Sequence, residues 1–459
     1  MKAMKQPQSM KVRLGFVPSH RLVFKKSEQW AKELRDRTLR VLNQIDCLEV
    51  ITPDEKLTGN GLVQTDEDAE KVIRLFKERD VDGIIIVAVD FGDEIPAALV
   101  ASALSKPIIL FATKEPPFTE NGGRVSDSFC GTLSIGSALY RRKIPFVWGG
   151  IVFPEEKEFA KSIEDFARTC AIVKGFLGAK IGLVGPRPER FETCAFDEVT
   201  LIEAFKQRII PVSLVEIKAI AEDLANDPEV NEIVRSIKTE ANTESVDEDT
   251  LVKMARLERS LKIFAHKWKL DAMGIQCWEP LHRTFGTATC YVNGRLTDQG
   301  IMVSCEADIL GALTMLIQYL ASLKKASPFF IDWTIQHQEK ENVFLAWHCG
   351  NAPPSLATEK PKVVYGGLGN FQVKSGMVTI NRLVEYDGKF KMLITTGRIL
   401  ESHQHLQGTW AWVEVPDLRK LYEDLLKSGF THHASMIHGD YTKAIQDACE
   451  ILGIEVVKL

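Results

Sequence analysis

The sequence predicts an α/β protein in which two Rossmann-like parallel-sheet domains precede a mostly antiparallel β domain. Continuous apolar runs such as IIIVAV alternate with amphipathic segments early in the chain, and the alternation starts again at AKIGLVG. After Pro328 the sequence turns into short β-branched and aromatic runs separated by Gly, Pro and Asp-Gly turns. We therefore expect three domains, at residues 1–175, 176–325 and 326–459.

In the first domain, strands and helices are expected to alternate. The expected order is strand KVRLGFVP, helix SEQWAKELRDRTLRVLNQI capped by its serine, strand CLEVITP, helix DEDAEKVIRLFKERD, strand VDGIIIVAVDF, helix EIPAALVASAL and strand KPIILFATKEP. Strands that are apolar on both faces, separated by helices of this length, indicate a parallel sheet covered on both sides. The segment has no GxGxxG loop, so no dinucleotide site is predicted.

The second domain repeats this pattern from AKIGLVGPRPERF onward. The charged stretch 221–259 predicts long exposed helices, LDAMGIQCWEP predicts a strand that runs into a loop, and CEADILGALTMLIQYLASL predicts a helix of about five turns. The β region begins with FFIDWTIQ and NVFLAWHCG, continues through GMVTINRLVEYDGKFKMLITTGRIL and TWAWVEV, and ends in a helix and the short strand IEVVKL.

Composition excludes several classes of function. The net charge is −5, and Lys and Arg are scattered, so neither nucleic acid nor an anionic membrane is an expected partner. The apolar runs are too short to span a membrane, and the first residues lack the apolar core of a secretory signal. The nine cysteines contain no C-x-x-C pair. We therefore expect a cytoplasmic protein with free thiols.

Histidines gather near the end of the chain. The stretch GFTHHASMIHGD places three of them within seven positions. Of the ten histidines, seven follow residue 336, namely His337, His348, His403, His405, His432, His433 and His438. This clustering favours a metal site over a polar surface loop.

Carboxylates that could complete such a site lie upstream of the histidines. Glu306 and Asp308 stand in VSCEADILGAL, Asp332 in FFIDW, and His348 in LAWHCGNAP. Each residue also has a structural interpretation. Glu306 could be an acid in the first turn of a helix, Asp332 a turn former and His348 a hydrogen-bonded core residue. Taken together, two carboxylates and one or two imidazoles favour Mn²⁺, Mg²⁺ or Co²⁺ over a thiolate-preferring ion, with Mn²⁺ expected to work best.

These segments, in this order, resemble the superfamily of L-fucose and L-arabinose isomerases. VSCEADILGALTML resembles the E-N-D-x-L-N-G and G-E-G-D-W helix entrances of its two branches, and FFID their F-A-D or F-M-E strand. LAWHCGNAP resembles G-x-H-M-L-E-V-C-P of the arabinose enzymes, and SGFTHHASMIHGD the G-G-A-H-H-T of one branch. The chain is shorter than these enzymes, which points to a shorter fucose isomerase-like branch that includes isomerases of sugars such as sulfoquinovose.

The resemblance implies a role for each matching residue. Glu306 and Asp332 become metal ligands and the acid/base pair, His433 becomes the imidazole ligand, and His348 joins them if the arabinose-type site is the better model. His432 is expected to be a hydrogen-bonding neighbour, and Asp440 is a candidate acceptor for the second N–H of His433. The resemblance also implies a homo-oligomer, a hexamer or a trimer.

Residues at strand ends are candidates for binding the substrate, although a core role is an alternative for the tryptophan. They are Gln276, Trp278, His20, Arg21 and His438, of which His20 and Arg21 could act in the site of a neighbouring subunit. An arginine there would suit a sulfonate or phosphate group. The expected substrate is a pentose, a 6-deoxyhexose or a 6-substituted hexose such as sulfoquinovose.

The expected chemistry is aldose–ketose isomerisation of an open-chain sugar through an enediol. One carboxylate would remove the C2 proton and the other would return a proton to C1, with their order left open. A rival function is that of a non-catalytic sugar-binding protein, since two Rossmann-like domains in series also describe periplasmic binding proteins. The additional β domain and the position of the acids favour the isomerase.

Overall fold

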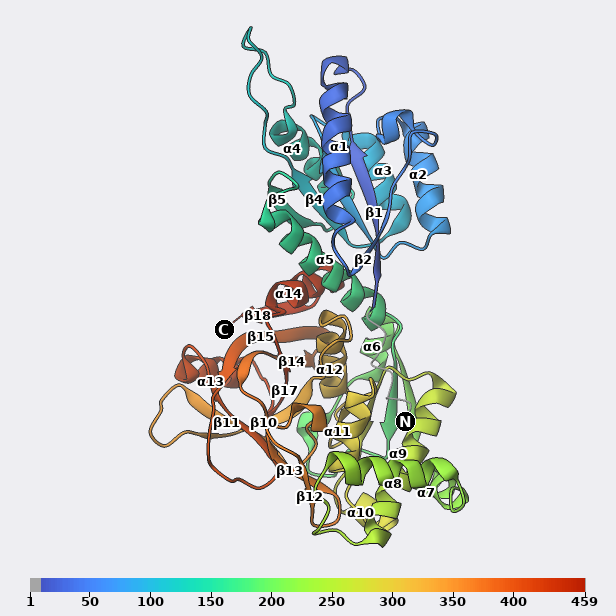
Figure 1. Ribbon diagram of the computed structural model, residues 1–459, viewed down its shortest axis with the longest axis vertical. Helices are drawn as coiled ribbons and strands as arrows, with labels where there is room; N and C mark the ends of the chain where they lie inside the picture. Colours follow the sequence, from blue (N-terminus) through green and yellow to red (C-terminus); the bar gives the residue numbers. More distant parts are fainter. Residues whose placement is uncertain (1–9, 459) are drawn as a thin grey trace. The chain divides into compact units, whose positions relative to one another are not determined.

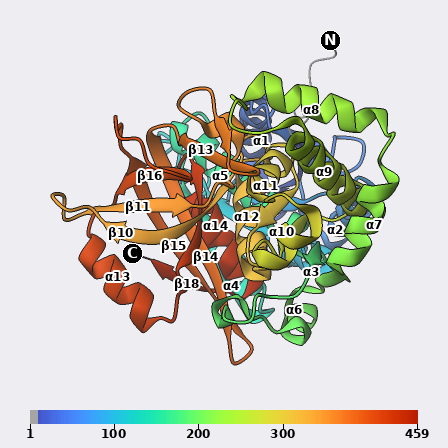
Figure 2. The same ribbon diagram turned by 90° about the horizontal axis from the view of Figure 1, so that it is seen from below.

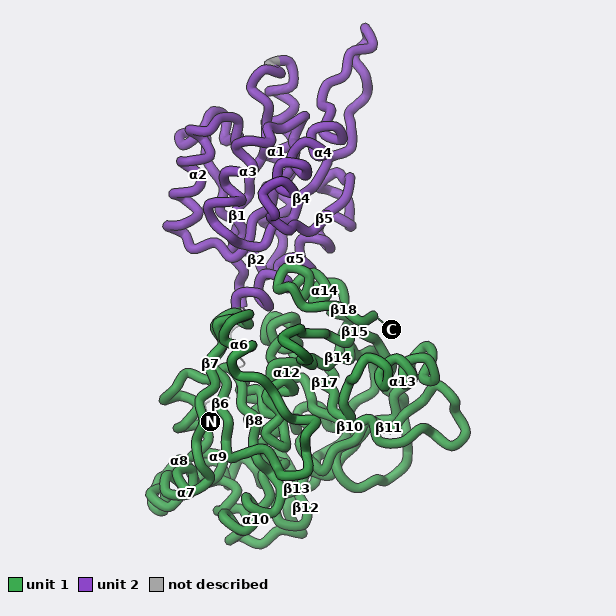
Figure 3. Tube along the Cα trace, turned by 180° about the vertical axis from the view of Figure 1, so that it is seen from behind, with its two compact units in different colours: residues 1–8, 175–459 green, residues 9–174 purple. Residues whose placement is uncertain are grey.

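The computed structural model describes residues 10–458 and forms two compact units. The smaller unit ends at residue 174, and the larger unit begins at residue 175 (Figure 3). Residues 1–9, which belong to the stretch considered above for a secretory signal, and residue 459 lie outside the described residues. Within the described part of the chain, no helix combines the length and the apolarity that a membrane crossing requires.

A five-stranded parallel sheet in the order β2-β1-β3-β4-β5 forms the centre of the smaller unit, as the sequence predicts. Its strands are β1 (Val12–Ser19), β2 (Leu48–Ile51), β3 (Gly83–Ala88), β4 (Ile108–Ala112) and β5 (Val147–Ile151). The helices are α1 (Glu28–Leu42), α2 (Asp66–Glu78), α3 (Glu94–Leu104), α4 (Ser128–Arg141) and α5 (Lys157–Phe176). Every residue of β3 and β4 is buried, which explains why these strands are apolar without alternation.

The predicted serine cap of α1 is wrong. Ser27 precedes the helix, but its side chain makes no capping hydrogen bond. Its hydroxyl instead contacts the carbonyl oxygen of Phe24 at 2.8 Å and a carboxylate oxygen of Asp90 at 2.5 Å. Both of these acceptors lie away from the first turn of the helix, so the hydroxyl is engaged before it can cap α1.

The larger unit contains the second parallel sheet, which has four strands in the order β7-β6-β8-β9. These strands are β6 (Lys180–Val184), β7 (Arg208–Val212), β8 (Ala272–Ile275) and β9 (Met302–Ser304). Its helices are α6 (Glu198–Phe205), α7 (Leu214–Asp223), α8 (Pro228–Glu240), α9 (Glu248–Trp268), α10 (Glu279–Phe285), α11 (Cys290–Asp298) and α12 (Ile309–Ala321). The second α/β pattern of the sequence is thereby confirmed.

A mostly antiparallel sheet follows in the same unit, again as predicted. Its strands are β10 (Phe329–Gln336), β11 (Val343–His348), β12 (Lys362–Val364), β13 (Leu368–Gln372), β14 (Gly376–Tyr386), β15 (Lys389–Ile399), β16 (Thr409–Glu414), β17 (His433–His438) and β18 (Glu455–Lys458). Because β16 pairs with both β11 and β15, the ring β16-β11-β10-β17-β14-β15 closes into a barrel. The helices α13 (Leu418–Lys427) and α14 (Thr442–Leu452) complete this part (Figure 1).

The helix α12 lies between the parallel sheet and the barrel (Figure 2). All of its residues are buried, and it contacts β8 and β9 on one side and β14 and β17 on the other. A helix that is apolar all round is expected in such a central position. It begins at Ile309, later than the sequence suggested, because Glu306 and Ala307 have left-handed backbone conformations and Asp308 caps its first turn.

Candidate metal centre

Polar atoms of Glu306, Asp332 and His348 lie around the imidazole of His433 in the larger unit. The Nε2 atom of His433 lies 3.6 Å from Oε2 of Glu306 and 3.6 Å from Oδ1 of Asp332. The Nε2 atom of His348 lies 3.6 Å from the same oxygen of Glu306. The sequence named these four residues as the candidate metal ligands. The fold brings Glu306, His348 and His433 into one group, and Asp332 joins His433 in a second group that also contains His432.

Three of these atoms are buried without a hydrogen-bond partner among the described residues. They are Oε2 of Glu306, Oδ1 of Asp332 and Nε2 of His348. An unpaired buried polar atom is costly, and three of them in the two groups that share His433 indicate a bound group. Atoms that lie about 2.0–2.2 Å from one ion are separated from each other by roughly 3–3.6 Å, which matches the observed distances. The oxygen and imidazole donors suit a hard or borderline divalent ion.

The barrel presents three of these side chains on adjacent strands. Asp332 lies on β10, between His348 at the end of β11 and His433 at the start of β17. Asp332 and His433 are direct partners in the antiparallel register, so their side chains project from the same face of the sheet. Glu306 comes from the opposite side, from the turn between β9 and α12.

The turn at Glu306 is strained. Glu306 has a φ of 53° and Ala307 a φ of 55°, a region that residues other than glycine rarely occupy. The turn rests on β8, where the Ala307 amide donates to the carbonyl oxygen of Ile275 at 3.0 Å. A Cβ at Gly274 would lie 2.9 Å from the Ala307 carbonyl carbon, so glycine is required there. Strain of this kind is often retained at functional sites, and here it directs Glu306 into the centre.

The second carboxylate oxygen of Glu306 faces the protein rather than the centre. The indole Nε1–H of Trp278 donates to Oε1 at 2.9 Å, and the Cys277 thiol donates to it at 3.2 Å. Burial alone would raise the pKa of Glu306, but the charges of His348 and His433, together with the Trp278 hydrogen bond, lower it to about 2. Glu306 is therefore held as a carboxylate, which is the form that binds a cation.

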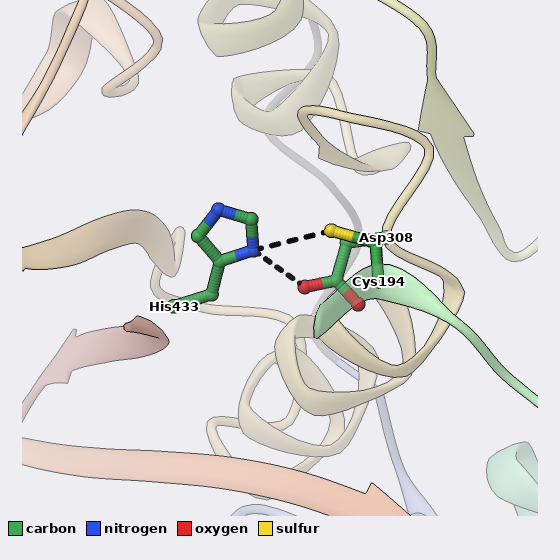
Figure 4. A group of neighbouring side chains, drawn as sticks. All are labelled: Cys194, Asp308 and His433. Atoms are coloured by element: carbon green, nitrogen blue, oxygen red, sulfur yellow. Dashed lines mark hydrogen bonds and ion pairs between the residues drawn. The ribbon is translucent and has the colours of Figure 1, made fainter. Parts of the chain in front are cut away.

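The orientation of His433 is set by a buried ion pair (Figure 4). Its Nδ1 atom lies 2.8 Å from Oδ2 of Asp308 and 3.7 Å from the sulfur of Cys194. Asp308 also pairs with the fully buried Arg382. Burial raises the pKa of Asp308, but Arg382 and His433 outweigh burial and lower the pKa below its usual range. An ionised Asp308 accepts the Nδ1 proton, so the neutral form of the ring directs the lone pair of Nε2 at the centre.

The expectation that Asp440 would accept from His433 is wrong. The Asp440 carboxylate accepts hydrogen bonds from the amide and the hydroxyl of Thr442 at the start of α14. Asp308 holds His433 instead, a contact between residues 125 positions apart that no local pattern predicts.

His348 has a different environment from His433. The backbone amide of Cys349 donates to Nδ1 of His348 at 3.0 Å, so a neutral ring carries its own proton on Nε2. In this arrangement His348 points a donor at the centre, whereas His433 points a lone pair at it. The ring of Phe330 packs against both imidazoles, with centroid distances of 5.6 Å and 4.7 Å.

Aromatic side chains lie beside the cluster. Phe191 has its ring centroid 5.2 Å from that of the half-exposed Trp278 and 6.1 Å from that of His432. The His432 ring centroid lies 4.1 Å from that of His433, with the two rings tilted by 49°. Both histidines belong to one group of possible ligands with Asp332, so His432 is a second candidate imidazole at this point. Phe191 was not singled out in the sequence, because it lies in a loop with no apolar periodicity.

The remaining candidate substrate residues are placed elsewhere. Gln276 is buried at the end of β8, where its side chain packs against Gly185. His438 bonds the carbonyl oxygen of Lys374 at 2.9 Å, five positions along β17 from His433 and therefore about 16 Å away. In the smaller unit, His20 lies 2.7 Å from Asp90, and Arg21 pairs with Glu94. The fold thus brings Trp278 to the cluster and places His438 farther along β17, while Gln276 stays a prediction.

A group of thiols beneath Glu306 and His348 was missed in the sequence. Cys277 and Cys305 lie with Glu306 in one buried cluster, and Cys290 and Cys349 have their sulfur atoms 3.4 Å apart. These residues have no common spacing, so only the fold reveals their proximity. Arg382 was also missed, although a charged residue between Ile380 and Val384 on the apolar face of a strand is a signal that could have identified it.

Comparison with known proteins gives two family matches. The N-terminal domain of fucose/sulfoquinovose isomerases matches residues 15–177, and the C-terminal domain of L-fucose isomerases matches residues 347–459. The second match includes His348 and His433, whereas Glu306 and Asp332 lie between the two matched segments.

Curated relatives agree with these matches. A sulfoquinovose isomerase of Alkalicoccus urumqiensis is 26% identical over 82% of this chain and 86% of its own length. A sulfoquinovose isomerase of Priestia aryabhattai is 26% identical over 89% of this chain and 91% of its own. An L-arabinose isomerase of Bacillus licheniformis is more distant, at 24% identity over 78% of this chain and 76% of its own.

Proposed function

The chain belongs to the fucose/sulfoquinovose isomerase family, a group of aldose–ketose isomerases, and from this premise we propose a metal-dependent reaction through an enediol. The observation that carries the proposal is the convergence of buried, unpaired atoms from Glu306, Asp332 and His348 on the Nε2 atom of His433. A protein that only binds sugar has no use for such a set. We expect Mn²⁺ to serve best, with Mg²⁺ or Co²⁺ as substitutes.

Glu306, Asp332 and His433 form the ligand set that we propose for the ion. His348 joins them only if its ring gives up the amide hydrogen bond from Cys349, and otherwise it donates a hydrogen bond to the substrate. When bound, the ion polarises the carbonyl group of the sugar and so acidifies the proton at C2.

The two carboxylates carry the proton transfers in this proposal. One of them removes the C2 proton of the open-chain aldose, which leaves an enediol, and the other returns a proton to C1. The side chain of Asp332 is 24% exposed and that of Glu306 only 4%, so Asp332 is the more accessible of the pair. Each proton transfer of this kind contributes about 10²–10⁴ in rate.

We propose a 6-substituted hexose such as sulfoquinovose as the first substrate to test, with pentoses and 6-deoxyhexoses as alternatives. The half-exposed Trp278, fixed by its bond to Glu306, offers an aromatic face to the sugar. His20 and Arg21 stay candidates for the far end of the sugar, acting in a homo-oligomer. If Arg21 binds an anionic group, Arg21→Ala should raise KM for sulfoquinovose more than for an uncharged aldose.

The decisive experiment is a panel of aldoses incubated with the Mn²⁺-loaded protein in D₂O. We expect ketose formation, with solvent deuterium appearing in the product, since a carboxylate that holds the transferred proton exchanges it with solvent. Sugar binding without ketose formation would favour the rival, a non-catalytic sugar-binding protein. Ketose free of deuterium would contradict the return of the C1 proton by a second carboxylate that exchanges with solvent, while leaving the isomerase assignment in place.

A further inference from the structure

Two cysteines beside the proposed metal centre have their thiols in contact. The sulfur atoms of Cys290 and Cys349 are 3.4 Å apart, whereas a disulfide requires about 2.05 Å. Cys290 is the first residue of α11 and is 2% exposed. Cys349 directly follows β11 and is only partly buried, so it is the member of the pair that a small oxidant reaches first.

This arrangement is the one that reversible thiol oxidation requires, namely an accessible cysteine with a second cysteine next to it. The nearby buried thiol of Cys277 differs from this pair, because it donates its proton to a carboxylate oxygen of Glu306. No carboxylate lies between the sulfur atoms of Cys290 and Cys349, which are in direct contact. The two sulfur atoms therefore need only a small approach to form a bond.

We propose that hydrogen peroxide joins Cys349 and Cys290 in a disulfide that reversibly slows the enzyme. The Cys349 thiolate attacks one peroxide oxygen and becomes a sulfenic acid, and the released hydroxide takes up a proton as water. The Cys290 sulfur then attacks the sulfenic sulfur and expels a second water. Two thiols and one peroxide thus give one disulfide and two waters, and a dithiol such as dithiothreitol reverses the change.

The disulfide would act on the centre through His348. Cys349 touches this imidazole twice, since its amide donates to Nδ1 at 3.0 Å and its sulfur lies 3.3 Å from the same atom. Drawing the sulfur toward α11 by more than 1 Å therefore disturbs the group that orients the ring.

The chain after Cys349 cannot absorb this movement. A Cβ on Gly350 would lie 2.4 Å from the Gly369 amide nitrogen, and one on Gly294 in α11 would lie 2.3 Å from the Ala352 carbonyl oxygen. The side-chain amide of Asn351 also donates to the Cys305 sulfur at 3.2 Å. Since the following backbone is tightly packed, the displacement falls on Cys349 and on His348. The loss of turnover rests on the proposed function, whereas formation of the disulfide does not.

The test treats the Mn²⁺-loaded full chain with hydrogen peroxide and follows three readouts. Free thiols should fall from nine to seven, a peptide map should contain a peptide joined through Cys290 and Cys349, and ketose formation should fall at least fivefold. Dithiothreitol should restore all three. Cys130→Ser, which removes the exposed thiol of α4 in the smaller unit, is the matched control and should respond like the wild type.

Variants of the pair separate the steps. In Cys290→Ser the sulfenic acid has no partner cysteine, so no linked peptide forms. Dithiothreitol restores turnover only in molecules whose Cys349 has not been oxidised further to the sulfinic acid, so recovery should be less complete than in the wild type. In Cys349→Ser peroxide should leave turnover within twofold of the untreated variant. A wild-type map without the Cys290–Cys349 link, or a link that leaves turnover unchanged, would overturn the proposal. If no aldose is converted before oxidation, the proposed function fails, and the map and thiol count still decide whether the bond forms.

Discussion

The Nδ1 atom of His433 lies 2.8 Å from a carboxylate oxygen of Asp308, at a point where both side chains are almost completely buried. Asp308 performs three tasks at once. It caps α12 by accepting from the Gly311 amide at 2.8 Å, it neutralises Arg382, and it sets the tautomer of His433. The position of the imidazole is thus tied to the start of the central helix.

Replacing Asp308 by asparagine should remove the negative charge beside His433 and Arg382 while keeping the cap of α12. Asparagine caps helices as well as aspartate does, but it leaves the buried Arg382 without its counter-ion and no longer fixes the His433 proton. We expect Mn²⁺ affinity to fall about 10–100-fold and the free energy of unfolding of the metal-free protein to fall by about 3–5 kcal/mol. Calorimetric Mn²⁺ titration and urea unfolding measure the two effects.

The matched control is Asp247→Asn, the same change at the exposed cap of α9, which should leave both quantities nearly unchanged. If Asp308→Asn bound Mn²⁺ as tightly as the wild type, the hydrogen bond between this carboxylate and His433 would not contribute to metal binding.

The two proposed acids are tested by neutral isosteres. Glu306→Gln and Asp332→Asn should each keep the fold and lower kcat by at least about 10². Glu279→Gln is the control, because Glu279 is exposed on α10 and bonds only Arg283 among the residues described. Circular dichroism checks the fold and ketose formation gives kcat. A loss of less than about tenfold in either acid variant would remove that residue from the acid/base pair.

Metal removal should abolish turnover and lower stability together. Dialysis against EDTA leaves two carboxylates facing each other across His433, and an ion that binds only the folded state stabilises it by mass action. We expect no ketose formation after dialysis, recovery with Mn²⁺, and a Tm that rises with the Mn²⁺ concentration. Full activity in protein shown by elemental analysis to hold no metal would end the metal-dependent proposal.

Much of the fold was predictable because it depends on local sequence patterns, namely hydrophobic periodicity and turn residues. Apolar strands that alternate with helices identified both parallel sheets, and the Asp387-Gly388 pair identified the turn between β14 and β15. Both residues have positive φ values, 52° and 75°, as a two-residue hairpin turn requires. Closure of the barrel was not predictable, since it depends on pairing between β15 and β16, which no turn signal encodes.

The candidate site was likewise predictable only in part. Glu306, Asp332, His348 and His433 were named from residue type and order, and the fold places the other three around His433. The residues that orient them were not identified, because an aspartate that caps a helix and holds a histidine looks in the sequence like any cap. The left-handed turn at Glu306 was also not predictable, since no residue in CEADIL indicates a positive φ at the glutamate.

A buried ion pair outside the site should make stability depend on pH. Glu258 is fully buried and bonds Arg295 at 2.6 Å and Lys262 at 2.6 Å. Burial raises its pKa, but these two cations outweigh burial and hold the pKa below the ordinary 4.5. A lowered folded-state pKa means that the stabilisation is complete above about pH 4.5 and is lost as the pH falls toward the folded-state value.

Glu258→Gln should therefore lower the free energy of unfolding by about 3–5 kcal/mol at neutral pH, and the difference from wild type should narrow as the pH falls below about 4.5. Urea unfolding of the two proteins across this range measures it. Glu229→Gln removes an exposed partner of Arg259 and should change stability by no more than about 1 kcal/mol at any of these pH values. A gap that stays constant with pH would show that Glu258 does not act through its charge.

The neighbouring histidines give the sharpest test of the ligand set, because they differ in exposure and in partners but not in chemistry. His433 is 1% exposed and directs Nε2 at Glu306 and Asp332, whereas His432 is exposed and its ring is tilted against that of His433. His433→Gln should lower the amount of Mn²⁺ retained after gel filtration and lower kcat with it, and excess Mn²⁺ should restore part of both. His432→Gln should keep the metal content nearly intact, and its effect should fall on KM if this ring borders the sugar. The reverse pattern would show that His432 is the ligand and that the metal-bound state adopts a different register at the start of β17.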